Sequence, residues 1–235
     1  MQTPSKQQQT VLLIGASRGL GFAMTEEFLQ RGDKVIATGR ESSKDNLLRL
    51  AEKFPHLLEV ETADITAPEQ ISALRERLKD RQIDLLFVNA GVKNDDRETV
   101  ADVSTEEFTR VMVTNALSPM RVIESFKDLV VECGTLGVMS SGQGSLTNNT
   151  NGNFEVYRAS KSALNMLMRS FAARHHDDSR TLLLMAPGWV RTELGGPQGR
   201  LSIDESIPAL LDTMAAYRGR SGLHYLDYLG RVVPW

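Results

Sequence analysis

Two residues in the second half of the chain, Tyr157 and Lys161, have types and spacing suited to acid–base chemistry. Positions i and i+4 are neighbours on one face of a helix, so a lysine ammonium there would lower the free-energy cost of a tyrosinate. Such a tyrosine can give a proton to a carbonyl oxygen or take one from an alcohol. The same spacing is common between exposed residues of any helix, so the pair needs further support.

Three other polar residues could join this pair. Ser140 and Ser141 follow an apolar run, and either hydroxyl could donate to the same oxygen as the tyrosine. Asn115 lies midway along a helical pattern over residues 104–131, where it could hold that helix and a water chain to Lys161. Without the other signals, Asn115 would be an ordinary polar residue of a helix.

A glycine-rich turn near the start of the chain could hold a phosphate. The apolar run Val11–Ile14 leads into Gly15, Gly19 and Gly21, and a helical pattern follows. Gly15 allows a sharp turn, and the other two glycines allow a ligand to approach the backbone. The helix start offers free N–H groups and the positive end of its dipole to an anion. A plain strand–helix connection could carry the same glycines.

Residues after the second and third apolar runs bear on the choice of nucleotide. A dinucleotide site with a free ribose usually has Asp or Glu about 20 residues after the turn. Gly39 stands at that position here, with Arg40 beside it. Arg40 and Arg18 could pair with a 2′-phosphate, which favours NADP over NAD, although both could be solvated surface residues. Asp64 could accept from an adenine amino group or cap the following turn.

Strand and helix patterns alternate along the whole chain, which predicts an α/β fold with a parallel, doubly wound sheet. Three capping boxes, at 66–69, 104–107 and 202–205, indicate helix starts. The apolar runs that predict strands are Val11–Ile14, Val35–Ala37, Leu57–Val60, Ile83–Val88, Gly137–Met139, Leu182–Ala186 and Leu223–Leu226.

Composition excludes several classes of protein. The chain has 235 residues and a formal net charge of −3, which predicts one domain and no nucleic-acid partner. Cys133 is the single cysteine, and we expect it to be a small buried residue. Residues 1–9 are expected to form a flexible tail without a signal peptide. No membrane span and no metal site are expected, and the default location is cytoplasmic.

Six motifs in order resemble the short-chain dehydrogenases/reductases. They are Gly15-x-x-x-Gly19-x-Gly21, Asn89-Ala-Gly91, Asn115, Ser141, Tyr157-x-x-x-Lys161 and Pro187-Gly188-x-x-x-Thr192. The resemblance implies a Rossmann-like domain with a seven-stranded sheet in the order 3-2-1-4-5-6-7. It makes Tyr157 the acid/base and Ser141 the residue that positions the substrate oxygen. It also implies that Lys161 binds the nicotinamide ribose and lowers the tyrosine pKa, while Asn115 completes a proton relay.

Arg18 and Arg40 favour NADP(H) over NAD(H) as the cofactor, and the resemblance implies a small carbonyl or alcohol substrate. The ending of the chain is similar to the branch of C-factor signalling proteins and sniffer-type carbonyl reductases, so a redox-dependent regulatory protein is the alternative to a reductase. A homodimer or homotetramer is typical of relatives. Candidate substrate residues by position are Gln143, Leu146, Phe154, Trp189 and Leu194. The implied cofactor residues are Gly15, Ser17, Arg18, Gly19, Leu20, Gly21, Arg40, Asp64, Ile65, Asn89, Ala90, Gly91, Tyr157, Lys161, Pro187, Gly188, Val190 and Thr192.

Overall fold

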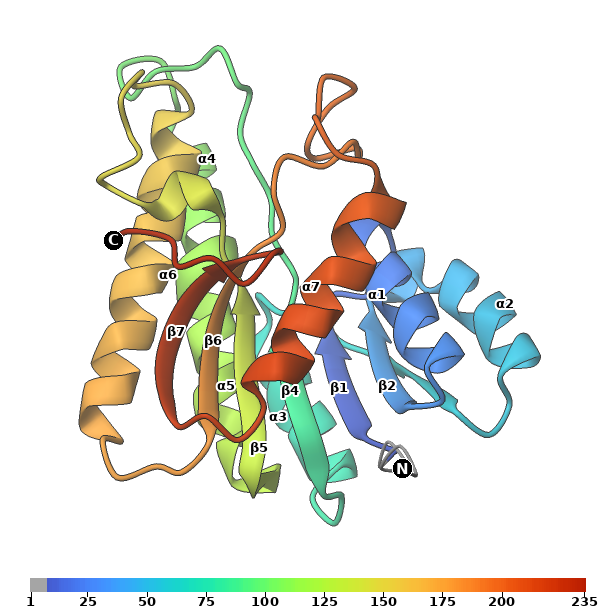
Figure 1. Cartoon of the computed structure of the whole chain (residues 1–235). Helices are drawn as coiled ribbons and strands as arrows, with labels where there is room; N and C mark the ends of the chain where they lie inside the picture. Colours follow the sequence, from blue (N-terminus) through green and yellow to red (C-terminus); the bar gives the residue numbers. More distant parts are fainter. Residues whose placement is uncertain (1–7) are drawn as a thin grey trace.

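A seven-stranded parallel sheet forms the centre of the molecule (Figure 1). The computed structural model describes residues 8–235, and residues 1–7 of the predicted tail lie outside that range. The strand order β3-β2-β1-β4-β5-β6-β7 confirms the prediction. The strands are β1 (Thr10–Ile14), β2 (Lys34–Gly39), β3 (Leu58–Thr62), β4 (Ile83–Val88), β5 (Val130–Met139), β6 (Thr181–Ala186) and β7 (Gly222–Asp227).

Helices cover both faces of this sheet, which explains why several strands are solidly apolar. Successive residues of β1 alternate between two hydrophobic clusters: Leu12 belongs to one, and Leu13 to the other. The first cluster includes residues of α3, α5 and α6, and the second includes residues of α1, α2 and α7. Figure 1 shows these two sets of helices on opposite sides of the strands. The carboxyl ends of the strands are left uncovered for a ligand.

Seven α-helices lie within the described residues, and most of them follow a predicted start. They are α1 (Gly19–Gln30), α2 (Asp45–Lys53), α3 (Pro68–Arg77), α4 (Thr105–Met112), α5 (Ser118–Phe126), α6 (Glu155–Arg174) and α7 (Ile203–Tyr217). Ser202 and Glu205 form the complete capping box predicted for α7. The Ser104 hydroxyl caps α4 by accepting from the Glu107 N–H. The Glu107 carboxylate pairs with Arg110, so the second bond of the capping box, from the Ser104 N–H, is not formed.

The capping box predicted at 66–69 is wrong. Helix α3 starts after Ala67, and no side chain caps it. Thr66 instead donates both its N–H and its hydroxyl to Asp64 Oδ1, at 2.8 and 2.6 Å. The Asp64 carboxylate, two residues upstream, accepts both Thr66 donors. These two bonds turn the chain between β3 and α3.

The helical pattern predicted over 104–131 is interrupted and shorter. A π-helical segment, Val113–Leu117, joins α4 to α5, and a 3₁₀ turn, Lys127–Leu129, ends the region. Strand β5 then begins at Val130, seven residues before the predicted start. The register of β5 against β4 shifts between Ile83 and Leu85, so the first part of β5 is irregular and lacks a recognisable pattern.

Cys133 lies in this irregular part of β5 and is exposed, so its predicted burial is wrong. The register shift turns the Cys133 side chain toward solvent, although cysteine is usually buried.

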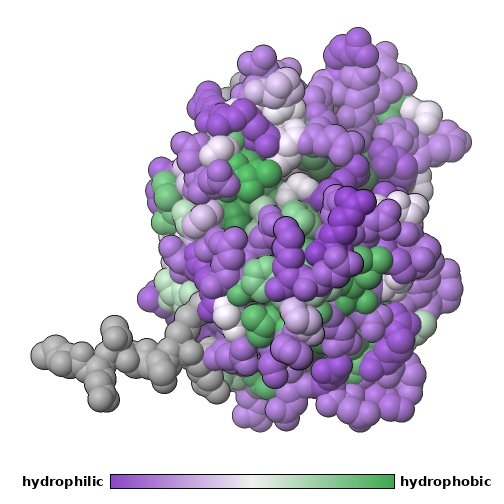
Figure 2. All heavy atoms as spheres, turned by 90° about the vertical axis from the view of Figure 1, so that its right-hand side faces the viewer, coloured by the Kyte–Doolittle hydropathy of each residue, from purple (hydrophilic) through white to green (hydrophobic). Residues whose placement is uncertain are grey.

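Figure 2 shows that the face on the right-hand side of Figure 1 is mostly hydrophilic, with apolar residues visible in places between polar ones. No helix within residues 8–235 is both long enough and apolar enough to cross a bilayer.

Candidate active site

The predicted acid–base residues meet at the carboxyl ends of β4, β5 and β6. Tyr157 and Lys161 lie in the first two turns of α6, and the Lys161 Nζ is 5.8 Å from the centre of the Tyr157 ring. The Ser141 side chain faces the Tyr157 phenol closely enough to act on its pKa. All three residues line one large cavity. The pair on the helix face is therefore not an exposed surface pair.

Ser140 and Ser141 have different roles in the structure. The Ser140 hydroxyl is buried and donates to Asn165 Oδ1 at 2.6 Å. The Ser141 hydroxyl accepts from the Gln143 N–H at 3.1 Å and faces the tyrosine. The residues alone left both serines open as donors, and both line the cavity, but the Ser140 hydroxyl is committed to Asn165.

Burial dominates the electrostatics of this cluster. Tyr157 remains partly accessible from the cavity, but burial raises its pKa to about 12, and the Ser141 side chain acts in the opposite direction. Burial also lowers the pKa of Lys161 to about 8. The lowering of the tyrosine pKa expected from Lys161 stays a prediction, because desolvation of the phenolate dominates the shift here. At neutral pH the phenol carries its proton.

Asn115 braces the site from inside the π-helical segment. Its side chain accepts from the Val92 N–H and donates to the Val92 carbonyl, both at 2.8 Å, and it also donates to the Ser160 hydroxyl at 2.9 Å. The Lys161 ammonium donates to the Met139 carbonyl at 2.9 Å, a contact that no sequence motif indicated. Asn115 is fully buried and does not line the cavity.

Gly91 shows how closely these groups approach. A Cβ at this position would lie 3.4 Å from Asn115 Oδ1 and 3.5 Å from Lys161 Nζ. The asparagine and the lysine therefore face the same small space across the main chain that follows β4. The water chain and proton relay expected between Asn115 and Lys161 stay predictions.

The cavity has a volume of about 1350 Å³ and runs along the carboxyl edge of the sheet. Gly21 lies beneath it, where a Cβ would be 2.2 Å from the Gly15 carbonyl oxygen. The other residues predicted to contact a cofactor all line the cavity: Gly15, Ser17, Arg18, Gly19, Leu20, Arg40, Asp64, Ile65, Asn89, Ala90, Gly91, Tyr157, Lys161, Pro187, Gly188, Val190 and Thr192.

The glycine-rich turn fits a phosphate group. Gly15 has φ +84°, and a Cβ there would lie 2.7 Å from the Ala90 nitrogen, so only glycine suits this position. Helix α1 begins at Gly19, and its N-cap residue Arg18 makes no side-chain capping bond. No acidic residue occupies the first turn. The N–H groups of that turn are thus available to an anion.

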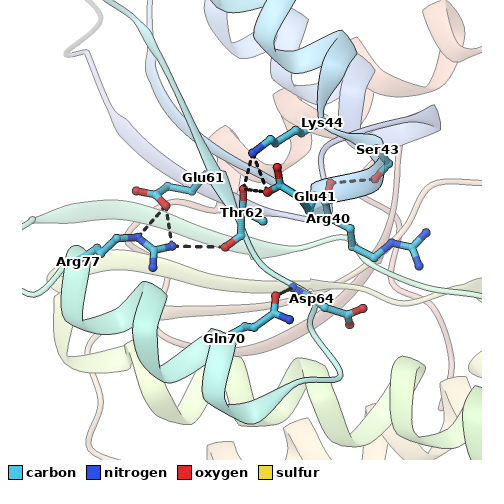
Figure 3. Close-up of polar contacts among 9 residues, drawn as sticks. All are labelled: Arg40, Glu41, Ser43, Lys44, Glu61, Thr62, Asp64, Gln70 and Arg77. Carbon is cyan, nitrogen blue, oxygen red and sulfur yellow. Dashed lines mark hydrogen bonds and ion pairs between the residues drawn. The ribbon is translucent and has the colours of Figure 1, made fainter.

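Charged residues surround the end of β2 (Figure 3). Lys44 donates to the Glu41 carboxylate at 2.8 Å, and this hydrogen bond lowers the pKa of Glu41. The Arg40 guanidinium points away from this pair in Figure 3. Arg18 forms an exposed ion pair with Glu193 at 2.7 Å. Asp64 caps its own turn through Thr66, the second of the two roles considered for it.

At the other end of the cavity, Gln143, Phe154, Trp189 and Leu194 form part of the wall. Leu146 does not: its side chain is 75% exposed and lies outside the cavity, so the expectation for this residue is wrong. The loop over residues 146–153, which is rich in asparagine (the Asn-rich loop), turns the Leu146 side chain toward solvent. Sequence reasoning also missed residues of the wall that come from distant segments, namely Lys93, Asp96, Arg110, Asp227, Tyr228, Arg231, Val232, Val233 and Pro234.

The charged members of this missed set are paired. Lys93 bonds Asp96 at 2.6 Å, and Arg231 bonds Asp227 at 2.6 Å. Arg110 pairs with Glu107, also at 2.6 Å. None of these residues belongs to a motif, and they join the wall only because the chain returns to the same edge of the sheet. The cations at this end are thus already neutralised by carboxylates.

Comparison with known proteins places this arrangement in a family. Residues 9–200 match the family model described as short chain dehydrogenase. The chain is 33% identical over 155 residues to the C-signal protein of Myxococcus xanthus, covering 65% of this chain and 93% of that protein.

Two solved structures are also similar. A Burkholderia multivorans protein assigned to the short-chain dehydrogenases/reductases, solved with bound NADP, is 56% identical with a TM-score of 0.95, covering 97% of this chain and all of that one. A carbonyl reductase from Pseudomonas aeruginosa PAO1 in complex with NADP is 35% identical with a TM-score of 0.90, at the same coverage. Together with the ordered motifs and the cavity, the family match leads to one conclusion. The chain belongs to the short-chain dehydrogenases/reductases, a family of oxidoreductases.

Proposed function

We propose that this protein is an NADPH-dependent carbonyl reductase in which Tyr157 acts as the general acid. The observation that carries the proposal is the convergence of the Ser141 hydroxyl and the Tyr157 phenol, beside Lys161 and within one cavity. A protonated phenol next to a second hydroxyl donor is the arrangement needed to receive a carbonyl oxygen that gains negative charge. The similar NADP-bound structures support the choice of nucleotide.

The dinucleotide would lie along the carboxyl edge of the sheet. The first turn of α1 would bind its pyrophosphate, and Pro187, Gly188, Val190 and Thr192 would surround its nicotinamide end. The bound nicotinamide supplies the hydride. Tyr157 gives its proton to the carbonyl oxygen, while Ser141 and Tyr157 stabilise the developing oxyanion. The Lys161 ammonium lies close enough to favour the tyrosinate that this transfer leaves behind.

Arg18 and Arg40 support a preference for the 2′-phosphate. Both line the cavity at its nucleotide end, and Gly39 replaces the acidic residue that would accept from a free ribose. Glu41 is close to this place, but Lys44 neutralises its charge. Arg18 pairs with Glu193 in this structure, so Arg40 is the guanidinium that would pair first with a 2′-phosphate.

A screen of neutral ketones and aldehydes with NADPH tests the proposal. We expect loss of NADPH absorbance at 340 nm with at least one class of carbonyl compound, and little turnover with NADH at equal concentration. Charged substrates should react poorly because the cations of the wall are already paired. Tight NADPH binding by calorimetry without turnover on any compound would contradict the reductase assignment.

The alternative is a regulatory protein that binds NADP and has little turnover. The similarity to C-signal supports it, since that relative carries a signalling name. Against it stands the Ser141 hydroxyl beside Tyr157, because Ser141 is not among the residues expected to bind the nucleotide. The same screen separates the two, because a binding protein would show affinity and no consumption of NADPH.

We also propose that the chain forms a homodimer through α6 and the π-helical segment, which pack against each other. Met166 is 63% exposed, and Leu167 and Leu117 are also exposed on these elements. Exposed apolar residues on neighbouring elements are typical of a protein interface. Light scattering coupled to size-exclusion chromatography should give twice the chain mass, and a Met166→Lys variant should shift it toward the monomer. A wild-type monomer would contradict this.

A further inference from the structure

The turn that carries Ser141 is supported by a buried tyrosine on the neighbouring part of the sheet. Tyr225 lies on β7, is 2% exposed, and donates its hydroxyl to the main-chain carbonyl of Ser141. Tyr225 does not line the cavity. It does not touch a ligand in the cavity, so its contact with the reaction runs through neighbouring residues such as Ser141. No motif in the sequence pointed to this residue.

Other bonds fix the two ends of the same turn. On one side the buried Ser140 hydroxyl donates to Asn165, as described above. On the other, the Gly144 carbonyl accepts from the Ser162 hydroxyl at 2.9 Å and from the Asn165 amide at 3.2 Å. Ser162 and Asn165 both belong to α6, the helix of Tyr157. Between the Ser140 bond and the two Gly144 bonds, the Tyr225 hydroxyl donates to the main-chain carbonyl of Ser141.

The orientation of Ser141 decides where its hydroxyl points. The peptide group between Ser141 and Gly142 is constrained by two donors, the Gly144 N–H at 2.9 Å and the Tyr225 hydroxyl. Without the tyrosine hydroxyl the carbonyl keeps the Gly144 bond, so it is not left unsatisfied and the fold should survive. The turn would nevertheless have more freedom to rotate, and the serine hydroxyl would lose its fixed direction toward Tyr157.

The ring of Tyr225 is itself fixed from the other side. It packs against Trp235 with 5.4 Å between ring centres, and the Trp235 main-chain oxygen accepts from the Thr147 N–H and hydroxyl, at 3.1 and 2.7 Å. Thr147 belongs to the Asn-rich loop that follows the Ser141 turn. The tyrosine thus sits between the catalytic turn and a packed C-terminal segment, which prevents its ring from moving away.

We propose that Tyr225 is a positioning residue that orients Ser141 toward Tyr157 during carbonyl reduction. This inference rests on the proposed function, since it assigns Tyr225 a part in the same reaction. A side chain outside the cavity would control the reaction through one main-chain hydrogen bond. Small errors of placement in a catalytic group are costly because the reaction needs a defined geometry.

The first test compares Tyr225→Phe with Tyr217→Phe. Both changes remove one phenol oxygen, but Tyr217 packs against His224 and lies outside the cavity. For Tyr225→Phe we expect kcat about 10-fold lower, part of the 10²–10³-fold loss that removal of an oxyanion donor causes. KM and the NADPH Kd should stay within about twofold, because neither ligand contacts Tyr225. Tyr217→Phe should change none of these constants. An unchanged kcat in Tyr225→Phe would overturn the proposal.

The second test is a double-mutant cycle with Ser141→Ala. If Tyr225 acts through Ser141, Tyr225→Phe should lower kcat by less than about twofold once the serine hydroxyl is gone. A further 10-fold loss in the Ser141→Ala background would mean that Tyr225 acts independently, and the proposal would be wrong.

Hydrogen–deuterium exchange gives a readout that does not depend on turnover. Amides of residues 140–146 should exchange faster in Tyr225→Phe than in wild type, and at the wild-type rate in Tyr217→Phe. Unchanged exchange in Tyr225→Phe would refute the positioning role. If the wild type shows no turnover at all, the proposed function fails, and the exchange experiment still decides whether Tyr225 fixes the turn.

Discussion

The two ends of the cavity are built in different ways. At the nucleotide end, the wall is mostly main chain: the turn at Gly15 and Gly19, the free start of α1, and the glycine after β4. At the reaction end, the working groups are side chains that come from four separate places, namely the π-helical segment, the end of β5, α6 and the C-terminal segment. The first end depends on local backbone shape, and the second on how distant elements pack.

This difference has a consequence for how each end tolerates change. A main-chain site is damaged by any side chain that fills its space, as at Gly15. A side-chain site is damaged when a single functional group is removed, even if the fold is unchanged. Substitutions at the two ends should therefore separate binding of the nucleotide from turnover, and the predictions below are arranged around that separation.

Tyr157→Phe should show the largest effect. Removal of the general acid is expected to lower kcat by about 10²–10⁴-fold, while the Kd for NADPH changes little because the ring remains in place. Stopped assays of alcohol formation and calorimetry with NADPH measure the two quantities. Turnover close to the wild-type rate would break the distinction between the two ends, because the reaction would then not need this side chain.

Arg40→Ser should act on the other end alone. Loss of a guanidinium that pairs with a 2′-phosphate is expected to weaken NADPH binding by about 10-fold, a cost of about 1.4 kcal/mol, and to leave NADH binding unchanged. Arg49→Ser, which changes an exposed arginine of α2, serves as the control. An equal loss for NADPH and NADH would show that Arg40 does not read the phosphate.

The pH dependence of turnover should report Lys161. Burial lowers the pKa of this lysine to about 8 and raises that of Tyr157 to about 12. Below pH 8 the ammonium is present and the phenol is protonated, so reduction should be at its plateau. As pH rises through 8 the lysine loses its charge, and kcat/KM, which reports the pKa values of the free enzyme, should fall while the phenol is still protonated.

A Lys161→Arg variant is the matched test of this assignment. The guanidinium stays charged up to a pH of about 12, so the fall near pH 8 should disappear from its profile, whatever the size of its plateau. A fall that remains at pH 8 in this variant would assign the titration to another group.

Phe154→Asn should produce the smallest effect and the one with an unusual sign. Phe154 has φ 61° and ψ 42°, a left-handed conformation that disfavours phenylalanine by about 1–2 kcal/mol and suits asparagine. Relief of this strain should raise Tm by about 2–4 °C. Phe108→Asn, in the regular helix α4, is the control and should not raise Tm. A lower Tm for Phe154→Asn would mean that packing of its ring outweighs the strain.

The same contrast explains what could be predicted from the sequence. The glycine turn and the helix that carries Tyr157 and Lys161 follow from local patterns, while the strand order is implied by the family resemblance; the structure confirms all three. The exposure of Cys133 depends on a register shift in β5, which leaves no trace in composition.

Tertiary contacts account for the other misses at the reaction end. Leu146 lies in a loop whose path is set by bonds from Thr147 to Trp235, far along the chain. The Met139 carbonyl that accepts from Lys161 is a main-chain group. Every residue has such a group, so the residue type at this position could not predict the contact. The raised pKa of Tyr157 likewise results from packing, which spacing alone cannot report.

The central claim is that this site delivers a hydride from NADPH to a carbonyl carbon beside Tyr157. Reduction with NADPH deuterated at the transferable position of C4 tests it most directly, with the alcohol product analysed by mass spectrometry and NMR. The account predicts one deuterium on the carbinol carbon, and no labelled alcohol from Tyr157→Phe in the same time. An unlabelled product, or labelled product at equal yield from the variant, would contradict it.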